Sequence, residues 1–168
     1  MSTPLEQVLL RRNKSEMIQF LSKNPEHFDK AMLLAMGIEP PLCWRAAWLI
    51  GGVIKKNDPR IKPHIPKIIQ VLPDRNDGHQ RELLKILLKM DLTEDFESLL
   101  FDLSVNVWEQ VRKQPSVRSF AFKGMVKVAE KYPELKDEVI LLSQPQYVNP
   151  LSAGIRKGIL KTIQELIS

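Results

Sequence analysis

Histidine and cysteine are the side chains of this sequence best suited to metal or nucleophilic chemistry. The three histidines, His27, His64 and His79, lack the spacing of metal ligands, so we predict no metal site. The single cysteine, Cys43, lies in a helical pattern without a partner motif, which is typical of a small buried hydrophobic residue. No glycine-rich phosphate loop and no Ser-His-Asp order stands out. We therefore predict neither an enzyme nor a cofactor.

Two tryptophans form the next group of interest. Trp44 and Trp48 lie four residues apart, with Arg45 between them, so one helix carries all three. Aromatic side chains at this spacing can stack on a nucleic-acid base or on a cation. A stripe of this kind is more often packed between helices, and we interpret both tryptophans, and the isolated Trp108, in that way.

The stretch 41–72 contains the helix that must position Cys43, Trp44 and Trp48, and a second helix after it. It contains two segments, one before and one after residue 57, and in each of them apolar side chains recur at the spacing of one helix face. Asp58 and Pro59 form an N-cap and a first-turn proline, so we expect the second helix to begin there and to stop at Pro73. Such a hairpin cannot bury both of its apolar faces alone, and it needs neighbours of the same kind.

The rest of the chain has the same character, and no strand pattern competes with it. Thr3 and Pro4 begin a short helix, Asn24 with Pro25 and Asn149 with Pro150 repeat the cap signal, and residues 144–148 are interpreted as a linker. We predict an all-α, right-handed α-α superhelix in a single domain, 1–168. Its expected parts are four helical hairpins at about 15–36, 40–72, 77–107 and 115–143, and a closing helix at 149–167.

An arginine recurs near the start of four successive first helices of these hairpins. The four residues, separated by 36, 37 and 38 positions, are Arg45, Arg81, Arg118 and Arg156. This near-constant period is typical of a helical repeat protein. Over roughly residues 15–167 the chain resembles the HEAT family, whose first helices often carry a Val-Arg-x-x-Ala core. The segments that match this core are Trp44-Arg45-Ala46-Ala47 and Val117-Arg118-Ser119-Phe120-Ala121.

Composition limits the class of protein. The chain has 168 residues, a net charge of +5, one cysteine and no run long enough for a membrane span. Residues 1–6 lack a basic segment followed by an apolar one, so we expect no secretory signal. We therefore expect a cytoplasmic protein that does not act in a membrane. Positive charge is concentrated on the first helices of the hairpins, and negative charge on the second helices of the later hairpins.

The HEAT resemblance implies that the second helices line the concave side, and their charge is mixed. A phosphate backbone requires cations along its length, whereas a mixed surface suits a protein or peptide. We therefore predict a non-catalytic binding scaffold. Its predicted partner-binding residues are Lys62, Lys67, Gln70, Glu94, Glu97, Asp102, Glu134 and Asp137.

Nucleic-acid binding through the basic first helices is the alternative. The phosphate contacts would be Arg12, Lys55, Lys56, Lys123, Lys127 and Lys157. This alternative includes a remote relationship to the HEAT-like DNA glycosylases that act on alkylated bases, because Trp44-Arg45-Ala46-Ala47 resembles one of their segments. Those enzymes use an aspartate in a basic groove, whereas Asp95 and Asp102 lie in a carboxylate cluster that we interpret as a solvated face.

Overall fold

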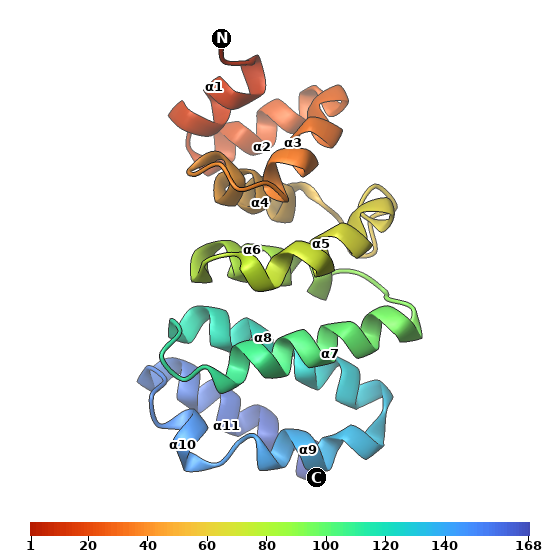
Figure 1. Cartoon of the computed structure of the whole chain (residues 1–168), viewed down its shortest axis with the longest axis vertical. Coiled ribbons are helices and arrows are strands. Elements are labelled where there is room, and N and C mark those ends of the chain that lie inside the picture. Colours follow the sequence, from red (N-terminus) through yellow and green to blue (C-terminus); the bar gives the residue numbers. More distant parts are fainter. The chain divides into compact units, whose positions relative to one another are not determined.

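The computed structural model describes residues 1–168 and contains only helices and their connections (Figure 1). The prediction of an all-α chain of paired helices is therefore confirmed, whereas the right-handed sense of the superhelix stays a prediction. The chain divides into two compact units, Met1–Asp91 and Leu92–Ser168, which we call the N-terminal unit and the C-terminal unit. The expectation of a single domain also stays a prediction.

Both units are built from helices, and three 3₁₀ turns in the N-terminal unit and one in the C-terminal unit are labelled η. The N-terminal unit contains α1 (Pro4–Arg11), α2 (Lys14–Lys23), η1 (Pro25–His27), α3 (Phe28–Ala35), α4 (Leu42–Val53), η2 (Lys62–His64), α5 (Ile65–Val71), η3 (Leu72–Asp74) and α6 (Asp77–Leu88). The C-terminal unit contains α7 (Glu94–Glu109), α8 (Pro115–Lys131), η4 (Pro133–Leu135), α9 (Lys136–Leu141), α10 (Pro145–Val148) and α11 (Ala153–Ile167).

The first helix begins as its sequence predicts. The Thr3 hydroxyl accepts a hydrogen bond from the Glu6 amide at 3.2 Å, and the Glu6 carboxylate accepts one from the Thr3 amide at 3.3 Å. This reciprocal pair satisfies two amides that would otherwise lack partners at the start of a helix. Asn13 and Asn76 cap α2 and α6 through their side-chain oxygens in the same manner.

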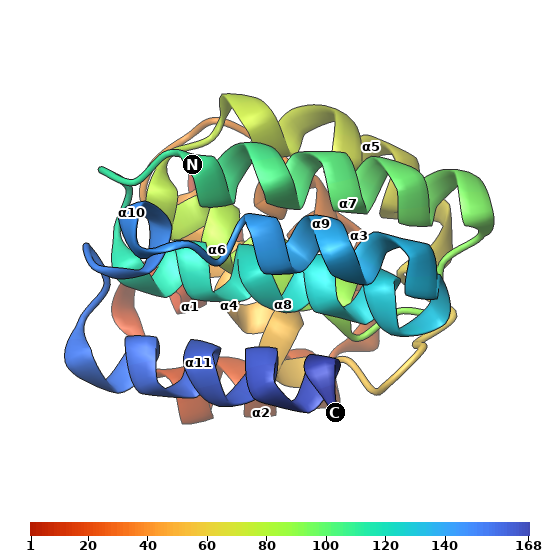
Figure 2. The same ribbon diagram turned by 90° about the horizontal axis from the view of Figure 1, so that it is seen from below.

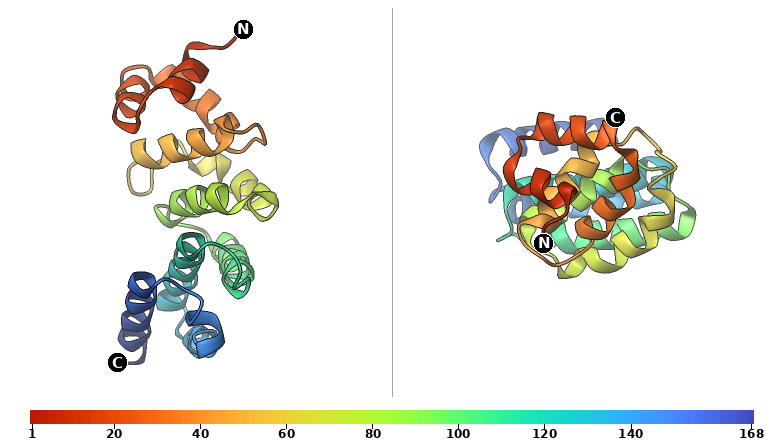
Figure 3. Two further views of the ribbon diagram at one scale, coloured as in Figure 1. Left: turned by 90° about the vertical axis from the view of Figure 1, so that its left-hand side faces the viewer. Right: turned by 90° about the horizontal axis from the view of Figure 1, so that it is seen from above.

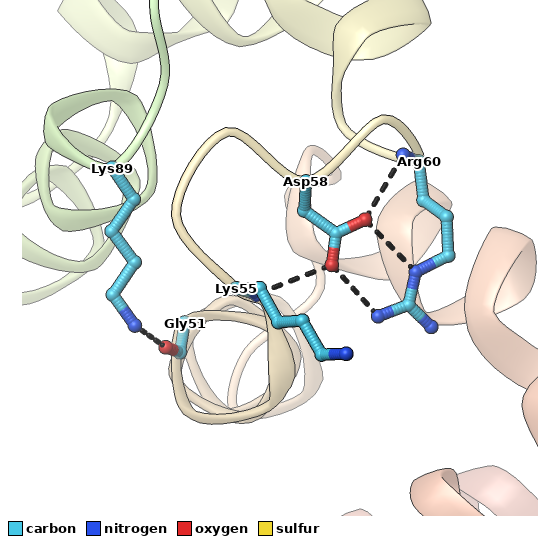
Figure 4. Close-up of polar contacts among 5 residues, drawn as sticks. All are labelled: Gly51, Lys55, Asp58, Arg60 and Lys89. Atoms are coloured by element: carbon cyan, nitrogen blue, oxygen red, sulfur yellow. Dashed lines mark hydrogen bonds and ion pairs between the residues drawn. The ribbon is translucent and has the colours of Figure 1, made fainter.

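Two predicted helix starts are wrong. The α5 helix begins at Ile65 and not at Asp58, because the Asp58 carboxylate closes a loop (Figure 4). It accepts hydrogen bonds from the Lys55 amide, the Arg60 amide and the Arg60 guanidinium, at 2.9–3.2 Å. The last helix begins after Ser152 and not at Asn149, and the predicted linker 144–148 contains the short helix α10.

Helix α4 is the centre of the N-terminal unit, in contact with α1, α2, α3 and α6. Its side chains Ala46, Ala47, Leu49 and Ile50 are fully buried. Lys89, just after α6, donates a 2.6 Å hydrogen bond to the Gly51 carbonyl (Figure 4). The sequence of α4 is apolar around most of its circumference, and the helix is therefore covered on almost every side.

Arg45 and Arg118, two of the four repeating arginines, link their helices to earlier parts of the chain. The Arg45 guanidinium donates hydrogen bonds to the carbonyls of Leu9 and Arg12 at the end of α1, the latter at 3.0 Å. The last carbonyls of a helix have no partner inside that helix, so an arginine from the next repeat can satisfy them. The arginine period therefore reflects a structural role at these positions.

The C-terminal unit is organised around the close packing of α7 on α8. Trp108 is fully buried, packs against Phe122 in a tilted arrangement with ring centroids 4.9 Å apart, and donates a 2.6 Å hydrogen bond to the Leu142 carbonyl. The interpretation of Trp108 as a packing residue is confirmed. Gly124 on α8 faces Ser104 on α7 so closely that a β-carbon at position 124 would overlap the Ser104 hydroxyl.

We expect Gly124→Ala to lower the free energy of unfolding by about 1–3 kcal/mol, because the added methyl group must displace Ser104 from a packed interface. Urea denaturation followed by circular dichroism measures the change. Gly158→Ala is the matched control. Nothing lies within 4 Å of a β-carbon at that helical position, so the substitution should stabilise the chain by up to about 1 kcal/mol. Equal stability of the two variants would contradict this account of Gly124.

Candidate functional site

A pocket of about 270 Å³ lies in the C-terminal unit, where α7, the end of α8, η4 and α9 meet. We call it the acidic pocket, because four carboxylates and three apolar side chains account for most of its lining. The residues that line it are Glu94, Ser98, Phe101, Asp102, Val128, Tyr132, Glu134, Leu135 and Glu138.

Helical spacing explains why these residues meet. Residues 94, 98, 101 and 102 follow the four- and three-residue spacing of one face of α7. Glu134 and Glu138 are four residues apart and lie about one turn from each other along η4 and α9. Phe101 and Val128 are buried, so they form an apolar floor below the carboxylates. The pocket therefore combines an apolar base with a negatively charged rim.

The rim carboxylates Glu94, Asp102, Glu134 and Glu138 form no hydrogen bond or ion pair within the chain. Four negative charges at one site raise one another's electrostatic energy, and a cation bound there would relieve it. The pocket is therefore prepared to receive positive charge from outside the chain.

Lys131, which is close to the pocket, is paired with a different carboxylate. Its Nζ lies 2.9 Å from the carboxylate of Glu97, which also accepts a 3.1 Å hydrogen bond from the Tyr132 hydroxyl. The hydrogen bond to Glu97 raises the pKa of Lys131 above its ordinary value. Burial raises the pKa of Tyr132, and the hydrogen bond to Glu97 raises it further. The charge of Lys131 therefore compensates mainly Glu97, and the rim carboxylate Glu94 adds a weaker electrostatic attraction.

This contact corrects one residue of the predicted binding surface. Glu97 is only 7% exposed, and its carboxylate is engaged by Lys131 and Tyr132. It supports the structure behind the acidic pocket and is not available to a partner. The expectation that Glu97 is a contact residue is therefore wrong.

The structure separates the other predicted contact residues into two groups. Glu94, Asp102 and Glu134 line the acidic pocket, and Asp137 is exposed on α9 outside it. The remaining three are exposed on η2 and α5 of the N-terminal unit; they are Lys62, Lys67 and Gln70.

Sequence reasoning omitted several residues that line the pocket. Glu138 could have been included, because it follows Glu134 by one helical turn. Phe101 and Tyr132 had no such signal, because an aromatic residue in a helical stripe predicts core packing equally well.

The residues of the nucleic-acid alternative do not form one cluster within the N-terminal unit. Arg45, in the first turn of α4, binds the Arg12 carbonyl, whereas Lys55 and Lys56 lie beyond the last residue of α4, so Arg12 and the two lysines are at opposite ends of this helix. In the C-terminal unit, Lys123 and Lys157 are exposed on α8 and α11, and Lys127 is half-buried.

The tryptophan pair of α4 already contacts a cation. Trp44 and Trp48 are half-buried, and the Arg45 guanidinium lies 5.4 Å and 5.9 Å from their ring centroids. The Nζ of Lys14 lies 4.9 Å from the Trp48 ring. The cations that stack on these rings thus belong to the chain itself, in agreement with a packing role.

The side chains of His, Cys, Asp and Glu form no group of three or more that could hold a metal ion. No helix is long and apolar enough to span a lipid bilayer. His79 is buried, with its Nε2 2.6 Å from the Ala35 carbonyl at the end of α3, and burial lowers its pKa below the ordinary value. A neutral imidazole in this position ties α6 to α3.

Comparison with known proteins identifies the family. A family model described as the HEAT repeat domain matches residues 1–165, almost the full length of the chain. No curated protein and no solved structure gives a significant match. The match agrees with the paired helices and with the regular spacing of the arginines in the sequence. The chain belongs to the HEAT repeat family.

Proposed function

We propose that this HEAT repeat chain is a non-catalytic scaffold whose acidic pocket binds a protein segment rich in lysine and arginine. The observation that carries the proposal is the rim of four carboxylates without intramolecular partners above an apolar floor. The aliphatic stem of lysine or arginine packs on apolar surface while its charged end reaches a carboxylate. Both parts of the pocket therefore match the same kind of side chain.

The size of the pocket supports a protein segment over a free small molecule. Its volume of about 270 Å³ is below the range of about 300–1,000 Å³ typical of small-molecule sites. It has room for one or two side chains of a longer segment. HEAT repeat proteins generally act as interaction scaffolds, and helical repeats offer extended surfaces to such segments. We also propose a cytoplasmic location, on the basis of the single buried cysteine.

The test compares two triple variants with the same change in net charge. The pocket variant is Asp102→Asn, Glu134→Gln, Glu138→Gln, and the control variant is Glu109→Gln, Glu130→Gln, Glu165→Gln. All six positions are exposed, so both variants should fold. The probe is a fluorescent peptide of alternating arginine and glycine, titrated by anisotropy.

We expect the pocket variant to bind the peptide about tenfold or more weakly than the wild type, because it loses three rim charges that each contribute up to about 1 kcal/mol. The control variant should bind within about twofold of the wild type, since none of its three acids lines the pocket and salt weakens interactions between exposed charges over about 8 Å. Equal losses in the two variants would show that only net charge matters, and would contradict the proposal.

Nucleic-acid binding through the basic residues of the first helices stays the alternative. A salt titration of duplex DNA separates it from the proposal, because affinity that depends on phosphate contacts falls steeply with salt. Micromolar binding that is lost on changing Lys123 and Lys157 to glutamine would favour the alternative. No retention of DNA at low salt would eliminate it.

A further inference from the structure

Helix α11 carries an exposed stripe that no other part of the C-terminal unit covers. Its buried side, with Ile159 and Ile163, faces the interior of the unit, where α11 contacts α8. The outer side forms a shallow hollow in which one leucine, 45% exposed, lies among three cations. We call these residues the basic stripe: Ala153, Arg156, Lys157, Leu160, Lys161 and Gln164.

The basic stripe is complementary to the acidic pocket in both charge and hydrophobic character. The stripe presents Leu160 between cations, and the pocket presents an apolar floor between carboxylates. The spacing of the cations also matches the spacing of the carboxylates. Lys157 and Lys161 are four residues apart on α11, and Glu134 and Glu138 are four residues apart along η4 and α9, so each pair extends over about one helical turn, roughly 6 Å.

The two surfaces lie on different sides of the C-terminal unit. Helix α8 lies between α7, which carries Glu94 and Asp102, and α11, as both Figure 2 and the left view of Figure 3 show. The stripe of one molecule therefore does not cover the pocket of its own unit. A contact between the two surfaces requires two molecules.

We propose that the basic stripe of one copy of this chain binds the acidic pocket of a second copy. The inference rests on the proposed function, and it identifies the lysine- and arginine-rich segment as α11 of another molecule. Leu160 enters above Phe101, and Lys157 and Lys161 pair with Glu134 and Glu138. Because the two contacting surfaces differ and lie on different sides of the unit, the contact is heterologous, and it joins molecules head to tail into a ring or an open chain.

The experiment is sedimentation velocity on the full chain over a range of concentrations. At about 50 mM salt the average mass of the wild type should rise with concentration, and at about 500 mM salt it should approach that of the monomer, because exposed ion pairs are screened. Two double variants, the stripe variant Lys157→Gln, Lys161→Gln and the double pocket variant Glu134→Gln, Glu138→Gln, should each associate about tenfold more weakly than the wild type. All four positions are exposed, so the variants keep their helices.

Mixing the two variants tests the heterologous geometry. The stripe variant keeps an intact pocket and the double pocket variant keeps an intact stripe, so the mixture should form a one-to-one dimer with wild-type affinity and should not grow further. A wild type whose mass stays constant up to about 1 mM at low salt would overturn the inference. A mixture no larger than either variant alone would do the same.

The arginine–glycine peptide distinguishes failure of the inference from failure of the proposed function. If the wild type is monomeric but binds the peptide, and only the triple pocket variant loses peptide affinity, self-association is overturned and the proposed function is left intact. If neither the peptide nor a second copy binds, both are wrong. If self-association holds, peptide should compete with it, because both occupy the acidic pocket.

Discussion

Replacing Arg118 by alanine is expected to lower the free energy of unfolding by about 3–5 kcal/mol. Arg118 is fully buried and donates hydrogen bonds to the carbonyls of Trp108 at 3.0 Å and Tyr147 at 2.7 Å. Its guanidinium also lies 4.4 Å from the Trp108 ring centroid. The alanine variant leaves two carbonyls without their donor and opens a cavity between α7, α8 and α10.

Arg118→Met separates the lost hydrogen bonds from the lost volume. Burial lowers the pKa of Arg118, and its Nη1 has no hydrogen-bond partner, so the charged group carries a desolvation cost. Methionine removes that cost and fills most of the space. We therefore expect Arg118→Met to be less destabilising than Arg118→Ala, and urea denaturation measures both.

Arg156→Ala is the matched control for the Arg118 prediction. Arg156 occupies the equivalent position of the next repeat, but it is half-buried and makes one 3.4 Å hydrogen bond, to the Leu151 carbonyl. Its loss should cost less than about 1 kcal/mol. If Arg118→Ala and Arg156→Ala lowered the free energy of unfolding by the same amount, the contribution of each arginine would depend only on its position in the repeat, and the account of Arg118 would be wrong.

The repeating arginines show how far the sequence predicts this fold. Their period predicts the helical repeats correctly, because each arginine occupies an equivalent helix position. The role of each one depends on its surroundings. Arg118 reaches the end of the preceding helix, whereas Arg81 places its Nε 3.1 Å from the carboxylate of Glu82, which is 3% exposed. A buried acid beside an arginine redirects it, and periodicity does not reveal that the acid is buried.

The helix boundaries that were predicted wrongly share a physical cause. An aspartate before a proline is suited both to cap a helix and to close a loop. Asp58 closes a loop because the guanidinium of Arg60, two residues later, supplies two further donors. Asn149 and Pro150 have the same ambiguity, and the chain turns there before α11 begins.

The candidate site was predictable in part. Sorting charge by helix identified Glu94, Asp102 and Glu134 as members of an acidic face, and all three line the pocket. The same sorting included Glu97, because helical spacing alone does not say which acid turns inward. Its burial depends on Lys131 and Tyr132, which are 34 and 35 residues away in the sequence. The pocket itself depends on the packing of α9 against α8, which no local pattern specifies.

Asp58→Asn is expected to lower the free energy of unfolding by about 2–4 kcal/mol at neutral pH, the second of the large effects. The Asp58 carboxylate is 4% exposed and is surrounded by donors from Lys55 and Arg60 (Figure 4). An asparagine amide has one acceptor oxygen where the carboxylate has two, and it turns an NH₂ group towards the donors. The loop before α5 then loses its closure, and Arg60 loses its ion pair.

The same substitution should remove a specific part of the acid sensitivity of the chain. The hydrogen bond from the Arg60 guanidinium holds the pKa of Asp58 far below its ordinary value of 3.8. Burial raises this pKa, but by less than the hydrogen bond lowers it, and the backbone amides of Arg60 and Lys55 lower the pKa further. A carboxyl whose pKa is depressed in the folded state stabilises the fold fully above its unfolded pKa. That stabilisation is lost as the pH falls below about 4, because the unfolded state then takes up the proton first.

The difference in stability between wild type and Asp58→Asn should therefore be constant above about pH 5 and should shrink steadily below about pH 4. Asp74→Asn is the control, because Asp74 is exposed and lies after α5 in the same unit. The free energy of unfolding of Asp74→Asn should stay within about 0.5 kcal/mol of that of the wild type at every pH. A constant difference for Asp58→Asn down to pH 2 would mean that the carboxylate charge contributes nothing, and that the loop is closed by packing of Arg60 on the Phe28 ring, 4.2 Å away.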